Sequence, residues 1–278
     1  MSTHAIEIAR GERFAFGENW ARYLGILDEA RIQEAEASLT QMLDVRNLAG
    51  KTFLDIGSGS GLFSLAARRL GARVHSLDYD PQSVACTAEL RRRYFPNDLD
   101  WTVEEGSALD RDYLSSLGRF DVVYSWGVLH HTGKMWDALD AAVLPVAPGG
   151  RLFIAIYNDT GKETIRWRRI KRIYNALPVP LKTPFILALI APAQLKEAAT
   201  ALITFRVRTY LESWTRCESK RGMSRWRDIV DWIGGYPYEA ARIDEIFDFY
   251  RARNCTMARV KSDSYRLGPN EFVFVKDR

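Results

Sequence analysis

The stretch that decides the fold is Leu54-Asp55-Ile56-Gly57-Ser58-Gly59-Ser60-Gly61, an apolar strand that runs into a glycine-rich loop. A helical pattern begins directly after it, at Leu62. Glycines allow a tight turn and the close approach of a ligand, and the N-terminus of the following helix offers free N–H groups and a positive dipole end. The loop therefore predicts a site for a carboxylate or phosphate. The alternative is a tight strand-to-helix turn without a ligand.

Short apolar strands alternate with helical segments after this loop. The strands are expected at 52–56, 73–78, 101–106, 120–126 and 150–157, and the helices at 62–70, 82–95, 109–117 and 135–144. This rhythm is typical of a parallel sheet with helices on both faces. Two more strands, at 255–265 and 271–277, predict a hairpin that completes the sheet with an antiparallel C-terminal edge strand. We therefore predict an α/β fold with a Rossmann-like, mostly parallel seven-stranded sheet.

The rest of the chain reads as helical. One or two helices are expected over 23–43, a basic helix over 160–177, and a proline-punctuated apolar stretch over 178–195. The predicted division is an N-terminal helical lid (1–45), a ligand-binding core (46–158), a helical insertion or substrate cap (159–253) and a C-terminal hairpin (254–278).

Composition sets limits on the class of protein. With 47% apolar and 27% charged residues, the 278-residue chain has the balance of a globular protein. A net charge of +4 is too small to indicate a nucleic-acid partner, and none is expected. The cysteines at 86, 217 and 255 form no CxxC pair, which argues against a disulfide framework or a zinc site and favours a reducing cytoplasm. No metal is expected.

Membrane insertion is not expected from the sequence. Residues 1–19 lack the apolar core of a signal peptide. The most apolar stretch, 185–195, is interrupted by Pro192 and is too short to span a bilayer.

A carboxylate follows the second strand. Asp78 comes about twenty residues after Gly57, where an acidic residue reaches ribose hydroxyls in nucleotide-binding folds. The alternative is an acidic helix cap, and Asp80 before Pro81 fits that role. We assign the ribose contact to Asp78 and the cap to Asp80.

The glycine spacing is GxGxG, with Leu62 where a dinucleotide fingerprint has its third glycine. This spacing resembles motif I of class I S-adenosylmethionine-dependent methyltransferases, and the likeness extends over about 50–160. The segments 120–131 (FDVVYSWGVLHH) and 148–152 (PGGRL) are similar to later motifs of that family. The resemblance implies S-adenosylmethionine as the cofactor, and it argues against a nicotinamide-dependent oxidoreductase, which is kept as the alternative from another class.

The resemblance also implies which residues surround the cofactor. Asp55, Gly57, Ser58, Gly59 and Gly61 would hold the methionine part, Asp78 the ribose and Tyr79 the adenine. Gly106, Ser107 and Ala108 would lie beside the adenine amino group, although many relatives have Asp where this chain has Ser107. Trp126 and Leu129 are expected as walls, with core packing as the alternative for Trp126. Phe16 and Trp20 are interpreted as part of a lid over the pocket, the alternative being a flexible tail.

Two adjacent histidines follow the fourth strand. Imidazole titrates near neutral pH, so His130 or His131 would serve as the base that takes a proton from a methyl acceptor. Adjacent residues need not point the same way, and of the two we favour His130. The alternative is a structural role for both.

The acceptor is a small molecule in this interpretation. The segment 158–162 resembles ubiquinone-pathway O-methyltransferases, whose acceptors are lipid-tailed phenols; N- or S-methylation is the alternative. The expected acceptor contacts are Tyr157, Asn158, Asp228, Tyr236 and Tyr238. The basic segment 162–174 and the apolar 181–195 are interpreted as a possible peripheral membrane contact or, alternatively, as a solvated helix face. The sequence does not indicate the oligomeric state.

Overall fold

The computed structural model describes residues 3–215, 225–262 and 267–277. Contacts within it divide the chain into two compact units. The core unit consists of Ala15–Ile165 and Pro237–Arg278, and the helical unit consists of Met1–Phe14 and Arg166–Tyr236. Each unit is therefore built from segments far apart in the chain. The division into four segments expected from the sequence stays a prediction.

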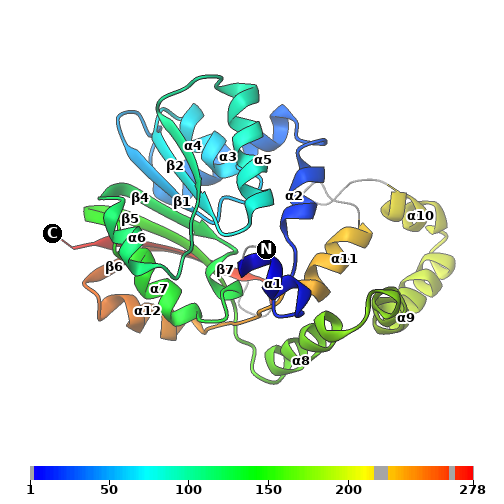
Figure 1. The fold of residues 1–278 in the computed structure, drawn as a ribbon. Helices are drawn as coiled ribbons and strands as arrows, with labels where there is room; N and C mark the ends of the chain where they lie inside the picture. The colour runs from blue at the N-terminus through cyan, green and yellow to red at the C-terminus, as the bar shows by residue number, and fades with distance from the viewer. Residues whose placement is uncertain (1–2, 216–224, 263–266, 278) are drawn as a thin grey trace. The chain divides into compact units, whose positions relative to one another are not determined.

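The core unit is built on a seven-stranded sheet with the order β3-β2-β1-β4-β5-β7-β6 (Figure 1). The strands are β1 (Thr52–Ile56), β2 (Arg73–Asp78), β3 (Trp101–Glu105), β4 (Phe120–Trp126), β5 (Val146–Tyr157), β6 (Cys255–Lys261) and β7 (Pro269–Lys276). The first five are parallel. The C-terminal strand β7 is antiparallel to β5, as predicted, but it lies between β5 and β6, so β6 forms the edge.

Helices cover both faces of this sheet, as the alternating pattern predicts. One face packs against α3 (Glu29–Leu43), α4 (Leu62–Arg69) and α5 (Pro81–Tyr94), and the other against α6 (Arg111–Ser116), α7 (Met135–Val143) and α12 (Ile243–Arg251). Neighbouring strand residues alternate between the two cores: Phe53 packs on the first face and Leu54 on the second, and both are fully buried. The helix α2 (Gly17–Tyr23) completes the N-terminal part of the unit. Because the parallel strands end at one edge, that edge collects the loops that follow β1, β2, β3 and β4.

The helical unit contains α1 (Thr3–Ala9), the part of α8 (Lys162–Ala176) from Arg166 onward, α9 (Val179–Ile203), α10 (Val207–Thr215) and α11 (Arg225–Gly234). Its small core consists of Tyr174, Ile186 and Ile233, surrounded by partly buried apolar residues. Lys171 is also fully buried here, with its ammonium group 4.3 Å from the centre of the Trp232 ring and donating to the Trp232 carbonyl.

The predicted interruption at Pro192 was wrong. Helix α9 continues through Pro184 and Pro192 to Ile203, for a length of 25 residues. A proline leaves the carbonyl four residues earlier without its helical partner, and both prolines are exposed, so water is available to that carbonyl. By length and composition α9 is the one helix, among the described residues, that meets the requirements of a membrane span, which is weak support for one.

Candidate functional site

The glycine loop after β1 makes backbone conformations and contacts that only glycine fits. Gly57 has a φ of +82°, and a Cβ there would lie 2.4 Å from a methyl group of Val128. Gly61 has a φ of +81° and is the N-cap of α4, where a Cβ would lie 2.9 Å from the Cα of Thr87. Positive φ and close approach are the two situations that favour glycine. The loop is therefore shaped by its neighbours on both sides. Its residues 58–61 are buried, whereas Gly57 and Leu62 on either side are half-buried.

Asp78, at the end of β2, lies directly beside this loop. Its Oδ2 accepts from the N–H of Gly59 at 2.9 Å, and its Oδ1 accepts from the N–H of Asp80 at 2.9 Å. Burial raises the pKa of Asp78 to about 6, although these two backbone N–H groups favour the charged form. Each carboxylate oxygen keeps a second acceptor position. The predicted proximity of Asp78 to the glycine loop is thus present.

Asp55, the acidic residue of the first strand, is more deeply placed than the sequence suggested. It is 2% exposed, and its Oδ2 accepts from the Ser64 hydroxyl at 2.6 Å. The Ser64 hydroxyl also lies 2.7 Å from that of Ser76, which accepts from the indole N–H of Trp101 at 2.9 Å. Burial raises the pKa of Asp55 to about 7. In this conformation Asp55 ties β1 to α4 and β2, and its contact with the methionine part stays a prediction.

The N-terminal aromatic residues lie against the loop. A Cβ on Gly59 would come within 3.1 Å of the Trp20 indole, and the N–H of Gly17 donates to the Oδ2 of Asp80 at 2.8 Å. Asp80 is also the N-cap of α5, accepting from the N–H of Gln82 at 2.9 Å, so the predicted cap is confirmed. Phe16 lies farther along, with its ring centre 5.1 Å from that of His131. Phe16, Gly17 and Trp20 thus lie beside the candidate site.

Most of the remaining predicted cofactor residues lie at or just after the ends of neighbouring strands. The N–H of Gly106 donates to the carbonyl of Asp78 at 3.0 Å, which brings the end of β3 beside that of β2. The Ser107 hydroxyl accepts from the N–H of Leu109 at 3.2 Å. Tyr79 and Trp126 are partly exposed, whereas Ala108 is 8% exposed and Leu129 is fully buried in the core. A wall formed by Leu129 would therefore need a different conformation.

The two histidines sit in a cluster of aromatic rings beyond β4. They occupy a short 3-10 helix, Leu129–His131. His130 is fully buried, with its ring centre 4.0 Å from that of Tyr157, at the end of β5. His131 is 8% exposed, and its Nδ1 lies 2.6 Å from the carbonyl oxygen of Pro237. Tyr238 packs on Tyr157 with ring centres 5.2 Å apart.

The Pro237 contact determines which imidazole nitrogen of His131 carries a proton. A carbonyl oxygen only accepts, so Nδ1 must donate. In the neutral ring, Nε2 then holds the lone pair that a base requires. The two histidines therefore differ: His131 has a defined tautomer and some solvent exposure, and His130 is enclosed.

The other predicted acceptor residues are divided between the two units. Asn158 is 6% exposed and its Oδ1 accepts from Asn270 at 3.2 Å, which joins β5 to β7. Asp228 and Tyr236 belong to the helical unit, where the carbonyl of Tyr236 accepts from the N–H of Phe14 at 3.0 Å. Their role at the acceptor stays a prediction.

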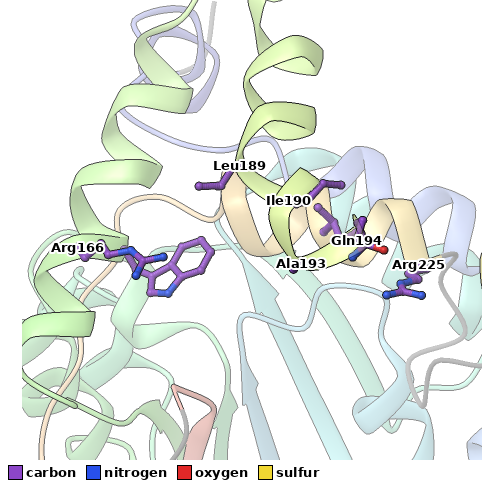
Figure 2. Close-up of a pocket in the computed structure, with 8 residues that line it drawn as sticks. Arg166, Leu189, Ile190, Ala193, Gln194 and Arg225 are labelled. Carbon is purple, nitrogen blue, oxygen red and sulfur yellow. The ribbon is translucent and has the colours of Figure 1, made fainter. Parts of the chain in front are cut away.

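Sequence reasoning missed two kinds of feature. Val128 and Thr87 border the glycine loop, but neither residue type signals a site. It also missed a groove of about 330 Å³ within the helical unit, shown in Figure 2. Its lining residues come from α8, α9 and α11: Arg166, Trp167, Leu189, Ile190, Ala193, Gln194, Arg225 and Ile229. Because these residues are up to 63 positions apart, no local pattern marks the groove.

Comparison with known proteins identifies the core. Residues 54–152 match the family described as methyltransferase domain. This segment resembles a class I methyltransferase domain. The cofactor of this family is S-adenosylmethionine, so the predicted family and cofactor are confirmed, and no support is found for the oxidoreductase alternative.

Two relatives of known name match about half of this chain or less. A ubiquinone biosynthesis O-methyltransferase of Escherichia fergusonii is 31% identical over 150 residues, which are 53% of this chain and 60% of that protein. A ribosomal protein L11 methyltransferase of Methylococcus capsulatus is 32% identical over 116 residues, which are 41% of this chain and 36% of that protein. The chain thus spans less than two thirds of the length of these curated relatives.

Solved structures confirm the fold. A magnesium protoporphyrin IX methyltransferase from Synechocystis PCC 6803 with bound SAH (S-adenosylhomocysteine) has a TM-score of 0.56 at 15% identity, covering 97% of this chain and 99% of that one. An O-methyltransferase family protein from Burkholderia thailandensis has a TM-score of 0.56 at 13% identity, covering 98% of this chain and 66% of that one. At these identities the likeness concerns the fold alone.

Proposed function

We propose that the chain transfers the methyl group of S-adenosylmethionine to an oxygen of a small or lipid-tailed phenol or quinol. The observation that carries this proposal is the hydrogen bond between the Gly59 N–H and the Asp78 carboxylate, at 2.9 Å, which joins a glycine loop and a carboxylate at the ends of adjacent parallel strands. Ligands of open α/β sheets bind at that edge. The oxygen acceptor is suggested by the ubiquinone biosynthesis O-methyltransferases among the relatives.

The residues present fit this cofactor. The glycine loop would receive the methionine part, Asp78 would accept from the ribose hydroxyls, and Trp20 would shield the loop from water. When bound, S-adenosylmethionine supplies an activated methyl group on a sulfonium centre. The protein then needs mainly to align the acceptor and exclude water, and alignment alone contributes roughly 7–11 kcal/mol to lowering the barrier.

We assign the base to His131 in preference to His130. Its Nδ1 donates to the Pro237 carbonyl, so in the neutral ring Nε2 carries the lone pair that a base requires. His130 is fully buried against Tyr157, and we propose that it positions that ring. Tyr157 and Tyr238 would form the wall of the acceptor site nearest to His131. The proposed place of action is the cytoplasm, where the buried thiols Cys86 and Cys255 would stay reduced.

Calorimetric titration with S-adenosylhomocysteine tests the cofactor site. Asp78→Ala should weaken binding by roughly 10-fold to 100-fold, because it removes charge-assisted acceptors. Glu34→Gln, an exposed carboxylate of α3, is the matched control and should bind as the wild type does. Wild-type protein that binds no S-adenosylhomocysteine at high micromolar concentration would end the proposal.

A coupled homocysteine assay over phenols, quinols and amines tests the transfer and its base. His131→Gln keeps a donor for the Pro237 carbonyl but has no base, so kcat should fall by about 10²–10⁴ with unchanged cofactor affinity. The loss should shrink as the pH approaches the pKa of the phenol, because an ionised acceptor needs no base. His75→Gln, which changes a histidine bonded to Glu104, is the control. A kcat unaffected by His131→Gln would remove His131 from this role.

A further inference from the structure

The two compact units carry net charges of opposite sign. The helical unit has 16 Lys and Arg against 7 Asp and Glu, a net charge of +9. The core unit has 23 against 28, a net charge of −5. The modest +4 of the whole chain conceals this separation. A concentrated positive charge attracts an anionic partner.

The helical unit also exposes large apolar side chains. Of the 25 residues of α9, only Ile186 and Ala201 are buried. Phe205, after the end of α9, is 94% exposed, and Ile203 is 77% exposed. The other exposed apolar residues of α9 and α10 are Val179, Leu181, Leu187, Leu195, Leu202, Val207 and Leu211. Exposed apolar side chains in this number along two consecutive helices favour an interaction surface over a solvated face.

The groove combines the same two properties. Its walls are apolar, while Arg166 and Arg225 lie on opposite sides of them (Figure 2). Gln194 adds a buried Oε1 that has no hydrogen-bond partner among the described residues. Arg166 forms no ion pair within the described part of the chain, and Arg225 pairs with Glu197. Positive side chains around an apolar surface match a lipid, which has an anionic headgroup and an apolar chain.

We propose that the helical unit docks on an anionic phospholipid bilayer, with the exposed apolar side chains of α9 and α10 in the interface and the arginines of α8 on the headgroups. Apolar insertion and basic charge are the two contributions that hold interfacial helices on membranes. The proposal does not rest on methyl transfer, because vesicle binding needs neither cofactor nor acceptor.

The length of the apolar segment decides between lying on the bilayer and crossing it. Lys182 and Lys196 limit the uncharged part of α9 to residues 183–195. At 1.5 Å per residue this segment is roughly 20 Å long, whereas the hydrocarbon layer is about 30 Å thick. Ile186 is also buried in the core of the helical unit, so it does not face a bilayer. An interfacial position satisfies both limits.

Co-sedimentation of the full chain with vesicles tests the docking. We expect binding to phosphatidylcholine vesicles that contain phosphatidylglycerol, little binding to pure phosphatidylcholine, and a decrease as salt is added. Leu202→Ser with Ile203→Ser should weaken binding by at least about tenfold, because two apolar side chains leave the interface. Arg169→Gln with Arg172→Gln, on the exposed surface of α8, should weaken it roughly thirtyfold at low salt.

Matched variants in the core unit provide the controls. Leu99→Ser changes an apolar side chain that is 96% exposed, and Arg46→Gln with Arg73→Gln removes two exposed positive charges. These variants should bind vesicles as the wild type does.

Four results would overturn the proposal: no binding to phosphatidylglycerol vesicles, equal binding to neutral ones, equal losses in the core-unit controls, or resistance to extraction at alkaline pH, which indicates a spanning helix. The protein could instead be dimeric in solution, become monomeric on Leu202→Ser with Ile203→Ser, and fail to bind vesicles. That result would show that the surface binds a second copy of the chain.

Discussion

The core unit and the helical unit use their apolar residues in different ways. In the core unit, both faces of the sheet are covered, and residues such as Phe53 and Leu54 are fully buried. In the helical unit, a helix of 25 residues buries only two, and most of its large apolar side chains are exposed. The apolar residues of the first unit are explained by folding alone. The exposed apolar residues of the second unit require a partner. The net charge of +9 on this unit indicates that the partner is negatively charged.

The two units also differ in the kind of titratable group that they bury. The core unit encloses carboxylates, Asp55 and Asp78, beside its glycine loop. The helical unit encloses an ammonium group, Lys171. Burial disfavours the charged form in both cases, so it raises the pKa of the acids and lowers that of the lysine. The stabilities of the two units should therefore depend on pH in opposite directions.

The largest effect is expected at the glycine loop. Gly57→Ala adds a Cβ at a positive φ and 2.4 Å from Val128, which should destabilise the core unit by roughly 2–4 kcal/mol. Displacement of the loop should weaken S-adenosylhomocysteine binding by about 100-fold. Calorimetry and thermal unfolding measure the two effects.

Gly118→Ala is the matched control for this prediction. Gly118 has a φ of +89° but nothing within 4 Å of its Cβ position, so it isolates the backbone strain. Gly57→Ala with Val128→Ala should recover part of the binding. If both single variants behaved alike, the contact with Val128 would be irrelevant.

A smaller effect is expected from the buried carboxylate Asp55. Its pKa is about 7 in the folded chain and about 3.9 when unfolded, so the folded state binds more protons between these values. Stability should therefore fall as the pH rises from about 4 to 7. Asp55→Asn keeps an acceptor for Ser64. It should reduce the change in the free energy of unfolding over this pH range by roughly 1–3 kcal/mol. Urea unfolding at several pH values measures it, with Glu34→Gln as the exposed control. An unchanged slope would contradict the burial argument.

The smallest effect is expected from Lys171, with the opposite sign. Its pKa is about 7 in the folded chain, below the unfolded value of about 10.4, so the unfolded state binds more protons between them. The helical unit should gain stability as the pH rises through that window, and Lys171→Met should abolish roughly 1–2 kcal/mol of the gain. Hydrogen-exchange protection of α8 and α11 reports it. The exposed Lys196→Met should keep the dependence.

Much of the core unit could be predicted because its signals are local. The alternating pattern placed β1, β2 and β4 at their observed bounds, and the cap at Asp80 followed from the proline after it. The beginning of β5 at Val146 was not anticipated, because residues 146–150 carry a proline and two glycines. The pairing of Val146 with Phe120, which is nonlocal, extends the strand.

The candidate site was predictable in its residue types and less so in their roles. The sequence indicated Gly57, Gly59, Asp78 and the two histidines. From the sequence we favoured His130 as the base. Two adjacent histidines carry no local signal that shows which of them is enclosed in the fold. The Pro237 carbonyl that orients His131 lies 106 residues away and is visible only in the folded chain.

The sequence by itself determined the sheet, the glycine loop and the family, because strand alternation and glycine spacing are short-range properties that act wherever they occur. Only the tertiary structure decided that residues 1–14 join 166–236, that Asp55 is tied to Ser64, and that α9 leaves its apolar side chains exposed. Burial and charge separation depend on which distant segments pack together, and that information is absent from any single stretch of the chain.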